Sequence, residues 1–226
     1  NYFKDRLARF YGTVVNLAIA NDWMHKNPFA GIRFQEKEVI REVLTKEEIE
    51  RMMCKEFALP RLEYVRDVFI FCVFTGMAYV DVNNLRQEHI VRDNNDDLWI
   101  RKARQKTNNM CNIPLLKIPQ LLMEKYKNHP LCTKTGALLP VPSNQKMNSY
   151  LKEIADFCGI QKNLTTHTAR HTFATVVALA NGVSMENIAK MLGHSDIRMT
   201  QRYAKVMDSS IMRDMENVDK LFKSSE

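Results

Sequence analysis

The segment Arg61–Phe74 is apolar around nearly its whole circumference, which limits what the chain can fold into. A helix with apolar residues on every side has to be covered by other elements. The Thr75-Gly76 pair that follows favours a helix end at that point. The longest apolar run, Val68–Val80, contains this pair and is too short to cross a bilayer. We therefore expect a globular domain built around a buried helix.

Short segments with strand character follow this helix. They lie at residues 88–92, 98–103 and 111–115 and are separated by an Asp- and Asn-rich turn and by a basic turn. Such a pattern predicts a small three-stranded antiparallel meander. From Pro119 onward the pattern is helical, with breaks near residues 133–141, 159–166, 181–182 and 193–194. The expected fold is mainly α with one small antiparallel three-stranded β-sheet (α+β).

The N-terminal part of the chain predicts a separate unit. Residues 1–22 carry apolar side chains at helical spacing, and Asn27-Pro28 then favours a helix stop. A polar linker is expected at residues 35–42, after which Thr45 can cap a new helix while Glu48 reaches back to it. We expect units at 1–34 and 43–226. The helical pattern starts at Asn1, so we interpret the chain as a fragment of a longer one.

Charge and cysteine usage narrow the class of protein. A net charge of +7 favours an anionic partner, of which nucleic acid is the commonest. The five cysteines are widely spaced and form no C-x-x-C pair, which fits neither a disulfide framework nor a zinc site and favours a reducing cytosol. No cluster has metal-ligand spacing, so we expect no metal and no cofactor. His89 and His171 are interpreted as structural.

Three stretches carry residues suited to chemistry. Lys106 lies in the basic turn between two expected strands, His167 and Arg170 are three residues apart, and His194 precedes Tyr203 by nine residues. Each has an ordinary structural explanation when taken alone: a solvated turn, a capping histidine, a helix end or a packed tyrosine. The combination in this order is improbable by chance.

The combination resembles the tyrosine recombinase family, also called the phage integrase family. Residues 164–175 resemble its second conserved box, and residues 191–204 resemble its nucleophile box almost position for position. The resemblance extends from about Val43 to Val206. It implies the tyrosine recombinase catalytic-domain fold, with a C-terminal tail, for residues 43–226. The helix before Asn27 resembles the last helix of the family's core-binding domain, so residues 1–34 are expected to be a remnant of that domain.

The resemblance and the chemistry of a phosphodiester together suggest a role for each residue. The planar guanidinium of Arg170 can hold two phosphate oxygens. Tyr203 is the expected nucleophile, giving a 3′-phosphotyrosyl intermediate, and His167 is the candidate general base. By resemblance, His194 donates a hydrogen bond to the scissile phosphate. Lys106 would protonate the departing 5′ oxygen.

One position departs from the family pattern. The family usually has an arginine two residues after the Thr-Gly turn and an acid three residues later; here these positions hold Ala78 and Asp81. Some integrases of conjugative transposons lack that arginine as well, and the chain resembles them in this respect. The first candidate to replace it is Arg66, and the others are Arg86, Arg61 and Lys102.

The expected function is that of a site-specific DNA recombinase acting in integration or excision of mobile DNA. The expected partner is double-stranded DNA, bound by a homo-tetramer whose subunits are monomers in free solution. The protein is expected in the bacterial cytoplasm, associated with the nucleoid and not with a membrane. Basic residues are expected to neutralise backbone phosphates: Arg101, Lys102, Arg104 and Arg202. Alternatives are a type IB topoisomerase-like enzyme and a catalytically impaired DNA-binding remnant.

Overall fold

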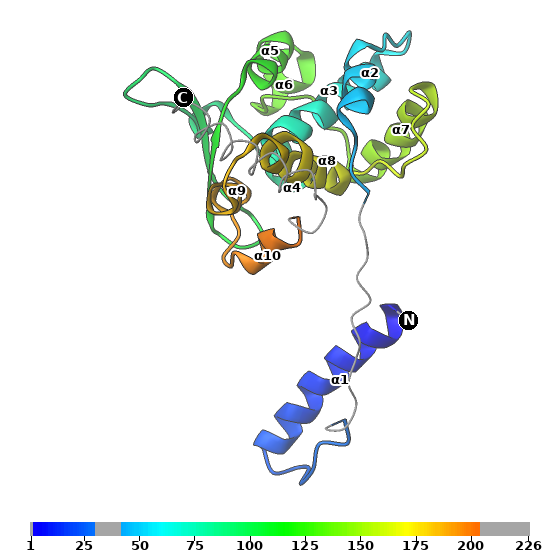
Figure 1. The fold of residues 1–226 in the computed structure, drawn as a ribbon, viewed down its shortest axis with the longest axis vertical. Helices are drawn as coiled ribbons and strands as arrows, with labels where there is room; N and C mark the ends of the chain where they lie inside the picture. Colours follow the sequence, from blue (N-terminus) through cyan, green and yellow to red (C-terminus); the bar gives the residue numbers. More distant parts are fainter. Residues whose placement is uncertain (1, 30–41, 204–226) are drawn as a thin grey trace, which may run out of the picture. The chain divides into compact units, whose positions relative to one another are not determined.

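The computed structural model describes residues 2–29 and 42–203, which fall into two compact units, Asn1–Ile40 and Arg41–Glu226. In the first unit the described helix is α1, Tyr2–Ala20. The elements of the second unit are, in order, α2 (Lys46–Cys54), α3 (Pro60–Thr75), α4 (Tyr79–Asn83), η1 (Gln87–His89), β1 (Ile90–Arg92), β2 (Leu98–Ala103), β3 (Met110–Pro114), α5 (Lys117–Tyr126), α6 (Pro130–Thr135), α7 (Asn144–Phe157), α8 (Thr166–Thr172), η2 (Phe173–Ala178), η3 (Leu179–Asn181), α9 (Met185–Leu192) and α10 (Arg198–Gln201). The prediction of a mainly helical domain with one small sheet is confirmed (Figure 1).

Helix α3 lies at the centre of the second unit. Pro60 occupies its first turn, where a missing N–H costs nothing, and Gly76 ends it in the left-handed conformation. Helices α2, α5, α7 and α8 pack around it. Phe69 and Phe71 are fully buried on opposite sides of the helix, as expected for a helix that is apolar all round. The expectation of a buried central helix is confirmed.

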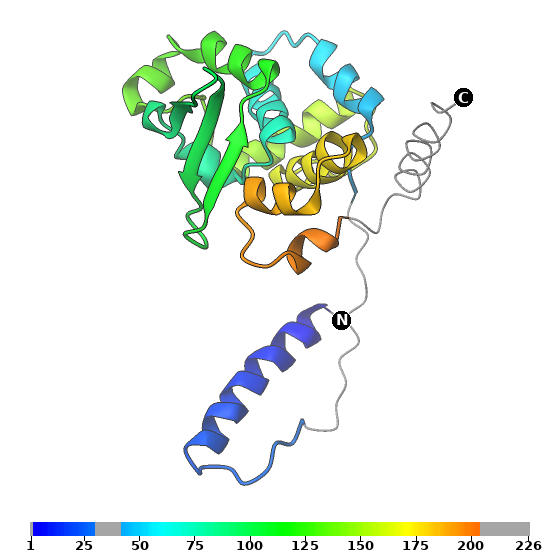
Figure 2. The ribbon, with the colours of Figure 1, turned by 60° about the vertical axis from the view of Figure 1, so that its left-hand side comes forward.

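The sheet has the order β1-β2-β3, and both pairs of strands are antiparallel. Ile100 and Ile113 form a cross-strand pair that is buried against the helices, while Arg101, the next residue on β2, pairs with Asn112 and faces solvent. Strand β3 packs against α9. Figure 2 shows the β2–β3 hairpin standing beside the helices, with its turn on the side of α9 and α10.

The C-terminal helices share a small core of their own. Helix α8 starts at a capping box formed by Thr165 and Thr168 and continues directly into the π-helical turn η2. Inserted π turns are frequent at functional sites. The members of the small core come from η2, α9 and the segment after α10: Phe173, Ala174, Ala178, Ile188, Leu192 and Tyr203.

Element boundaries differ from the prediction by a few residues. The first strand starts at Ile90 rather than at residue 88, because the 3₁₀ turn η1 takes the residues before it and the His89 Nδ1 accepts a hydrogen bond from the Arg86 N–H at 2.9 Å. The predicted capping box at Thr45 and Glu48 is confirmed. Most of the predicted linker and the C-terminal tail lie outside the described residues. Among the described helices, none is long and apolar enough to span a membrane.

Candidate active site

Arg170 projects from α8 toward the ends of two other helices. It is only 7% exposed. Its Nη1 donates to the carbonyl oxygen of Gly76, directly after α3, and its Nη2 donates to that of Leu192, the last residue of α9, each at 2.6 Å. The carbonyls at a helix C-terminus carry partial negative charge. Both helix ends therefore hold and stabilise the guanidinium.

Two glycines allow the helices to end in this way. Gly76 and Gly193 follow α3 and α9 with φ of +66° and +60°, in the region that side chains disfavour. A Cβ at Gly76 would overlap the ring of Phe173. A Cβ at Gly193 would lie 2.6 Å from the Arg104 Cδ and 2.7 Å from the Cys111 Sγ. Glycine is therefore required at both positions by conformation and by space.

His194 lies between Arg170 and α10. Its Nε2 is 3.3 Å from the Arg170 Nη2, and its Nδ1 is 2.8 Å from the hydroxyl of Thr200. Burial first, and then the charges of Arg170, Arg104 and Arg202, lower the pKa of His194 to about 4. The imidazole is therefore neutral near pH 7.

Tyr203 is 8% exposed and lies against two histidine rings. It stacks on His194 with ring centroids 6.4 Å apart and planes at 8°. The ring of His171 lies closer, with centroids 5.3 Å apart and planes at 55°. The interpretation of His171 as purely structural did not foresee this contact. Its position directly after Arg170, and one helical turn after His167, was the signal that could have found it.

The β2–β3 turn brings Arg104 to the same place. The turn is closed by the Arg104 N–H, which donates to the Asn109 carbonyl at 2.9 Å. The Arg104 side chain is 11% exposed, and its Nη1 lies 3.4 Å from the Gly193 carbonyl oxygen. Its Nε is 3.9 Å from the Asp81 Oδ2 and, among the described residues, has no hydrogen-bond partner.

Asp81 fastens this turn to α4. Its Oδ1 accepts from the Gln105 N–H at 3.0 Å, and the Asn84 side-chain amide donates to the Gln105 Oε1 at 2.8 Å. Asp81 is 5% exposed, so these contacts are made in a largely buried setting. The acid that follows Ala78 thus positions the turn that carries Arg104.

The two arginines form a concentrated positive charge. Burial and then the charge of Arg104 lower the pKa of Arg170, while Tyr203 acts in the opposite direction. Charges that are buried beside each other need an oppositely charged partner. Asp81 supplies one carboxylate, but it lies beyond hydrogen-bond distance of the Arg104 Nε. The site therefore favours an anionic ligand that accepts several hydrogen bonds.

Lys106 and His167 are placed differently. Lys106 lies at the exposed tip of the β2–β3 turn, two residues after Arg104. His167 is exposed in the first turn of α8, one turn before Arg170. Arg170, His194 and Tyr203 are in mutual proximity, and the side chains of Lys106 and His167 are exposed to solvent.

Arg66 occupies a structural environment. Its Nε pairs with the Asp67 Oδ1 at 2.5 Å, and its Nη1 donates to carbonyl oxygens at the end of α2, including that of Lys55 at 2.8 Å. Its guanidinium also lies over the ring of Phe57. These contacts favour the structural ion pair with Asp67 over the role of substitute for an arginine at position 78.

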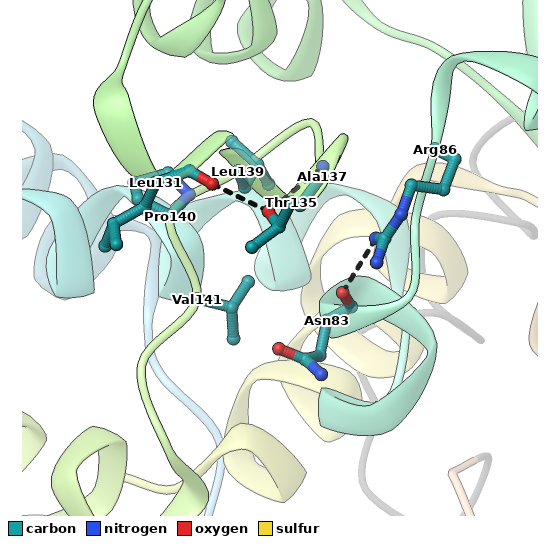
Figure 3. A pocket seen from close by; sticks show the side chains of 8 residues that line it. All are labelled: Asn83, Arg86, Leu131, Thr135, Ala137, Leu139, Pro140 and Val141. Carbon is teal, nitrogen blue, oxygen red and sulfur yellow. Dashed lines mark hydrogen bonds between the residues drawn. The ribbon is translucent and has the colours of Figure 1, made fainter. Parts of the chain in front are cut away.

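The other candidate substitutes also have partners of their own. Arg61 pairs with Glu153 at 3.2 Å, and the Lys102 Nζ lies 3.2 Å from the His89 Nε2. Arg86 donates to the Asn83 carbonyl at 3.0 Å and lines a separate pocket, shown in Figure 3. That pocket contains none of the residues described around Arg170: its lining is Asn83, Arg86, Leu131, Thr135, Ala137, Leu139, Pro140 and Val141.

Arg101 and Arg202 are exposed, as expected for residues that contact a nucleic-acid backbone, whereas Arg104 is not. Within residues 2–29 and 42–203, no three His, Cys, Asp or Glu side chains are grouped so that they could hold a metal ion.

The chain is similar to a known protein family and to known recombinases. The model of the phage integrase family matches residues 42–210. The tyrosine recombinase XerD of Staphylococcus saprophyticus is 40% identical over 95 residues, which are 42% of this chain and 31% of that protein. XerD of Staphylococcus aureus is 42% identical over 71 residues, which are 31% of this chain and 24% of that protein. The matched part thus spans about a third or less of these relatives.

Solved structures share the fold at low sequence identity. The integrase of the Tn1549 transposon, in complex with a circular intermediate DNA, matches with a TM-score of 0.66 and 16% identity, over 95% of this chain and 78% of that one. A lambda integrase dimer bound to a core site matches with a TM-score of 0.65 and 18% identity, over 85% and 69%. The XerA recombinase matches with a TM-score of 0.59 and 23% identity, over 81% and 66%.

Proposed function

Because the chain belongs to the phage integrase family, we propose that it cleaves and rejoins DNA strands as a site-specific recombinase in the integration or excision of mobile DNA. The observation that carries the proposal is that Arg104, His194 and Tyr203 all lie near Arg170, and that Tyr203 stacks on His194. A tyrosine beside donors that suit an anion is what covalent cleavage of a phosphodiester requires.

The first step transfers a phosphoryl group. The Tyr203 hydroxyl oxygen attacks the scissile phosphorus, its proton goes to His167, and a bond from Tyr203 to phosphorus forms. The bond to the 5′ oxygen breaks, and that oxygen takes a proton from Lys106. The product is a 3′-phosphotyrosyl linkage and a free 5′ hydroxyl. Attack by a 5′ hydroxyl reverses the step and reseals the strand, and it needs no cofactor.

Arg170 and Arg104 stabilise the charge on phosphorus in this scheme. Arg170 is held by two helix ends, so its free N–H groups are oriented before the phosphate arrives. We assign to Arg104 the role of the arginine that is missing at Ala78. Its guanidinium is close enough to lower the pKa of both Arg170 and His194, and its buried Nε lacks a partner among the described residues. With Arg104 in this role, Ala78 would not by itself make the chain a catalytically impaired remnant.

Replacing Arg104 by methionine is expected to slow cleavage by about a hundredfold or more, the scale of losing one oriented donor. Methionine keeps an unbranched apolar stem against Gly193 but removes the charge. Adding Ala78→Arg to this variant is expected to restore part of the rate. The measurement is the single-turnover rate of covalent adduct formation.

Arg66→Ala is the matched control for Arg104. It removes a guanidinium that caps α2, so it is expected to lower the melting temperature and leave the cleavage rate of the folded protein within a few-fold. The assignment to Arg104 is abandoned if Arg66→Ala is the variant that loses cleavage and Arg104→Met is not.

Lys106→Ala is expected to lose cleavage of an ordinary strand by about a hundredfold, within the range that general acids contribute. A substrate with sulfur in place of the 5′-bridging oxygen needs no proton on its leaving group. It is therefore expected to react with this variant nearly as fast as with the wild type. If Lys106→Ala cleaves the sulfur substrate as slowly as the ordinary one, Lys106 is not the general acid.

The proposed partner is double-stranded DNA, with a tetramer holding two duplexes and a monomer in free solution. The exposed Arg101, Lys102 at the sheet and Arg202 beside the site supply charge for backbone phosphates. We place this activity in the bacterial cytoplasm, at the nucleoid, where its substrate lies.

The experiment that tests the function is incubation with a nicked suicide substrate made from the DNA junctions next to the gene. Loss of a short strand fragment after cleavage traps the covalent intermediate, which is then seen as a slower band on a denaturing gel. A recombinase also exchanges strands between two such sites, whereas a type IB topoisomerase relaxes supercoils as a monomer. Absence of any adduct with junction DNA would refute the proposal.

A further inference from the structure

Thr200 differs from the other helical threonines in what its hydroxyl contacts. The hydroxyls of Thr75, Thr135 and Thr172 each donate to the carbonyl four residues earlier, at 2.7–2.8 Å, which is the usual choice of a threonine in a helix. Thr200 is fully buried on α10, and its hydroxyl lies 2.8 Å from the His194 Nδ1. A helical threonine whose hydroxyl faces an imidazole is placed to act on that imidazole.

The opposite side of the ring fixes where the proton lies. The His194 Nε2 is 3.3 Å from the Arg170 Nη2, and a guanidinium can only donate. Nε2 therefore accepts, and the single proton of the neutral ring is on Nδ1. Nδ1 then donates to the Thr200 oxygen, which acts as the acceptor in this state.

Binding of the scissile phosphate requires the reverse arrangement. Phosphate oxygens only accept, so a His194 that contacts the phosphate through Nε2 must carry its proton there. In a ring that carries a single proton, Nδ1 then has no proton and needs a donor. A hydroxyl is a group that can accept in one state and donate in the other by rotating about its C–O bond.

We propose that Thr200 is a positioning residue that sets the tautomer of His194, accepting from Nδ1 before DNA binds and donating to Nδ1 once the phosphate occupies the site. The inference rests on the proposed function. Arrival of the phosphate draws the Arg170 Nη2 from the ring to a phosphate oxygen, which frees Nε2. The ring keeps one proton throughout, exchanging it with water, since His194 is only partly buried.

The tautomer can be observed directly by ¹⁵N NMR of histidine-labelled full-length protein. The Tyr203→Phe variant is used, so that DNA binds without being cleaved. In the free protein the proton is expected on Nδ1 of His194, and in the complex with junction DNA it is expected on Nε2. A proton that stays on Nδ1 in the complex would overturn the proposal.

Kinetics provide the second test. Thr200→Val keeps the shape but removes the hydroxyl, and single-turnover cleavage is expected to fall about ten- to a hundredfold, as when a group that orients a functional histidine is lost. Thr200→Ser keeps a hydroxyl and is expected to stay within a few-fold of the wild type. Equal rates for wild type and Thr200→Val, or equally slow cleavage by the valine and serine variants, would overturn the proposal.

Thr172→Val is the matched control for loss of a buried hydroxyl. That hydroxyl accepts from the Leu44 N–H at 3.0 Å and donates to the Thr168 carbonyl, so its loss lowers stability without touching His194. The cleavage rate of the Thr172→Val variant is expected to stay near that of the wild type. If the wild type itself forms no adduct with junction DNA, the proposed function fails, whereas a wild-type adduct with normal cleavage by Thr200→Val refutes only the role of Thr200.

Discussion

Tyr203→Phe is expected to abolish covalent protein–DNA adducts while DNA affinity changes by less than about twofold, because only the nucleophilic oxygen is removed. The ring can remain in the small core of η2 and α9 and keep its stacking on His194. The measurements are adduct formation on a suicide substrate and DNA binding by a mobility shift at fixed salt, since phosphate contacts make affinity depend on salt.

Tyr126→Phe is the matched control for this prediction. Tyr126 is 6% exposed, close to the 8% of Tyr203, and its hydroxyl donates to the Asp67 Oδ2 at 2.7 Å. Its loss is expected to lower the melting temperature and to leave adduct formation intact. An undiminished adduct in Tyr203→Phe would mean that another residue is the nucleophile.

The sequence predicted those parts of the fold that local chemistry determines. The all-apolar segment before Gly76 had to become a buried helix, and it became α3. The Thr45 cap and the alternation of strands with polar turns are likewise short-range signals, and both were confirmed. Boundaries were less accurate because η1 competes with the start of β1 through the hydrogen bond between Arg86 and His89.

The environment of Arg104 could not be predicted from the sequence. A basic residue at a hairpin turn is expected to be solvated, and the sequence predicts that Arg104 contacts the DNA backbone. Its side chain is only 11% exposed because β3 packs on α9 and because Asp81 holds the next residue of the turn. Both contacts join segments far apart in the chain, so no local pattern encodes them.

The contacts that hold Arg170 could not be predicted from the sequence either. The H-x-x-R spacing indicated the arginine but not what holds it, which is the pair of carbonyls at the ends of α3 and α9. The glycines that follow these helices were read as helix stops, which they are. Their second effect, to keep the site free of a Cβ that would overlap Phe173 or Arg104, depends on tertiary contacts.

Arg170→Lys is expected to reduce cleavage by at least about a hundredfold, although it keeps the positive charge. The Arg170 guanidinium uses two different nitrogens: Nη1 donates to the Gly76 carbonyl and Nη2 donates to the Leu192 carbonyl, each at 2.6 Å. An ammonium is a single point and cannot keep both contacts and also present a planar pair of donors to phosphate. The measurement is the single-turnover rate of adduct formation at saturating DNA.

A stability loss has to be separated from this loss of rate. One buried carbonyl left unpaired costs about 1–3 kcal/mol, so Arg170→Lys is also expected to melt at a lower temperature. The rates are therefore compared well below both melting temperatures. Arg61→Lys is the matched control, because Arg61 forms a half-exposed pair with Glu153, and a change there is expected to alter neither stability nor cleavage appreciably. If Arg170→Lys cleaves within a few-fold of the wild type, Arg170 does not clamp the phosphate through its planar fork, and Arg104 would have to supply that contact alone.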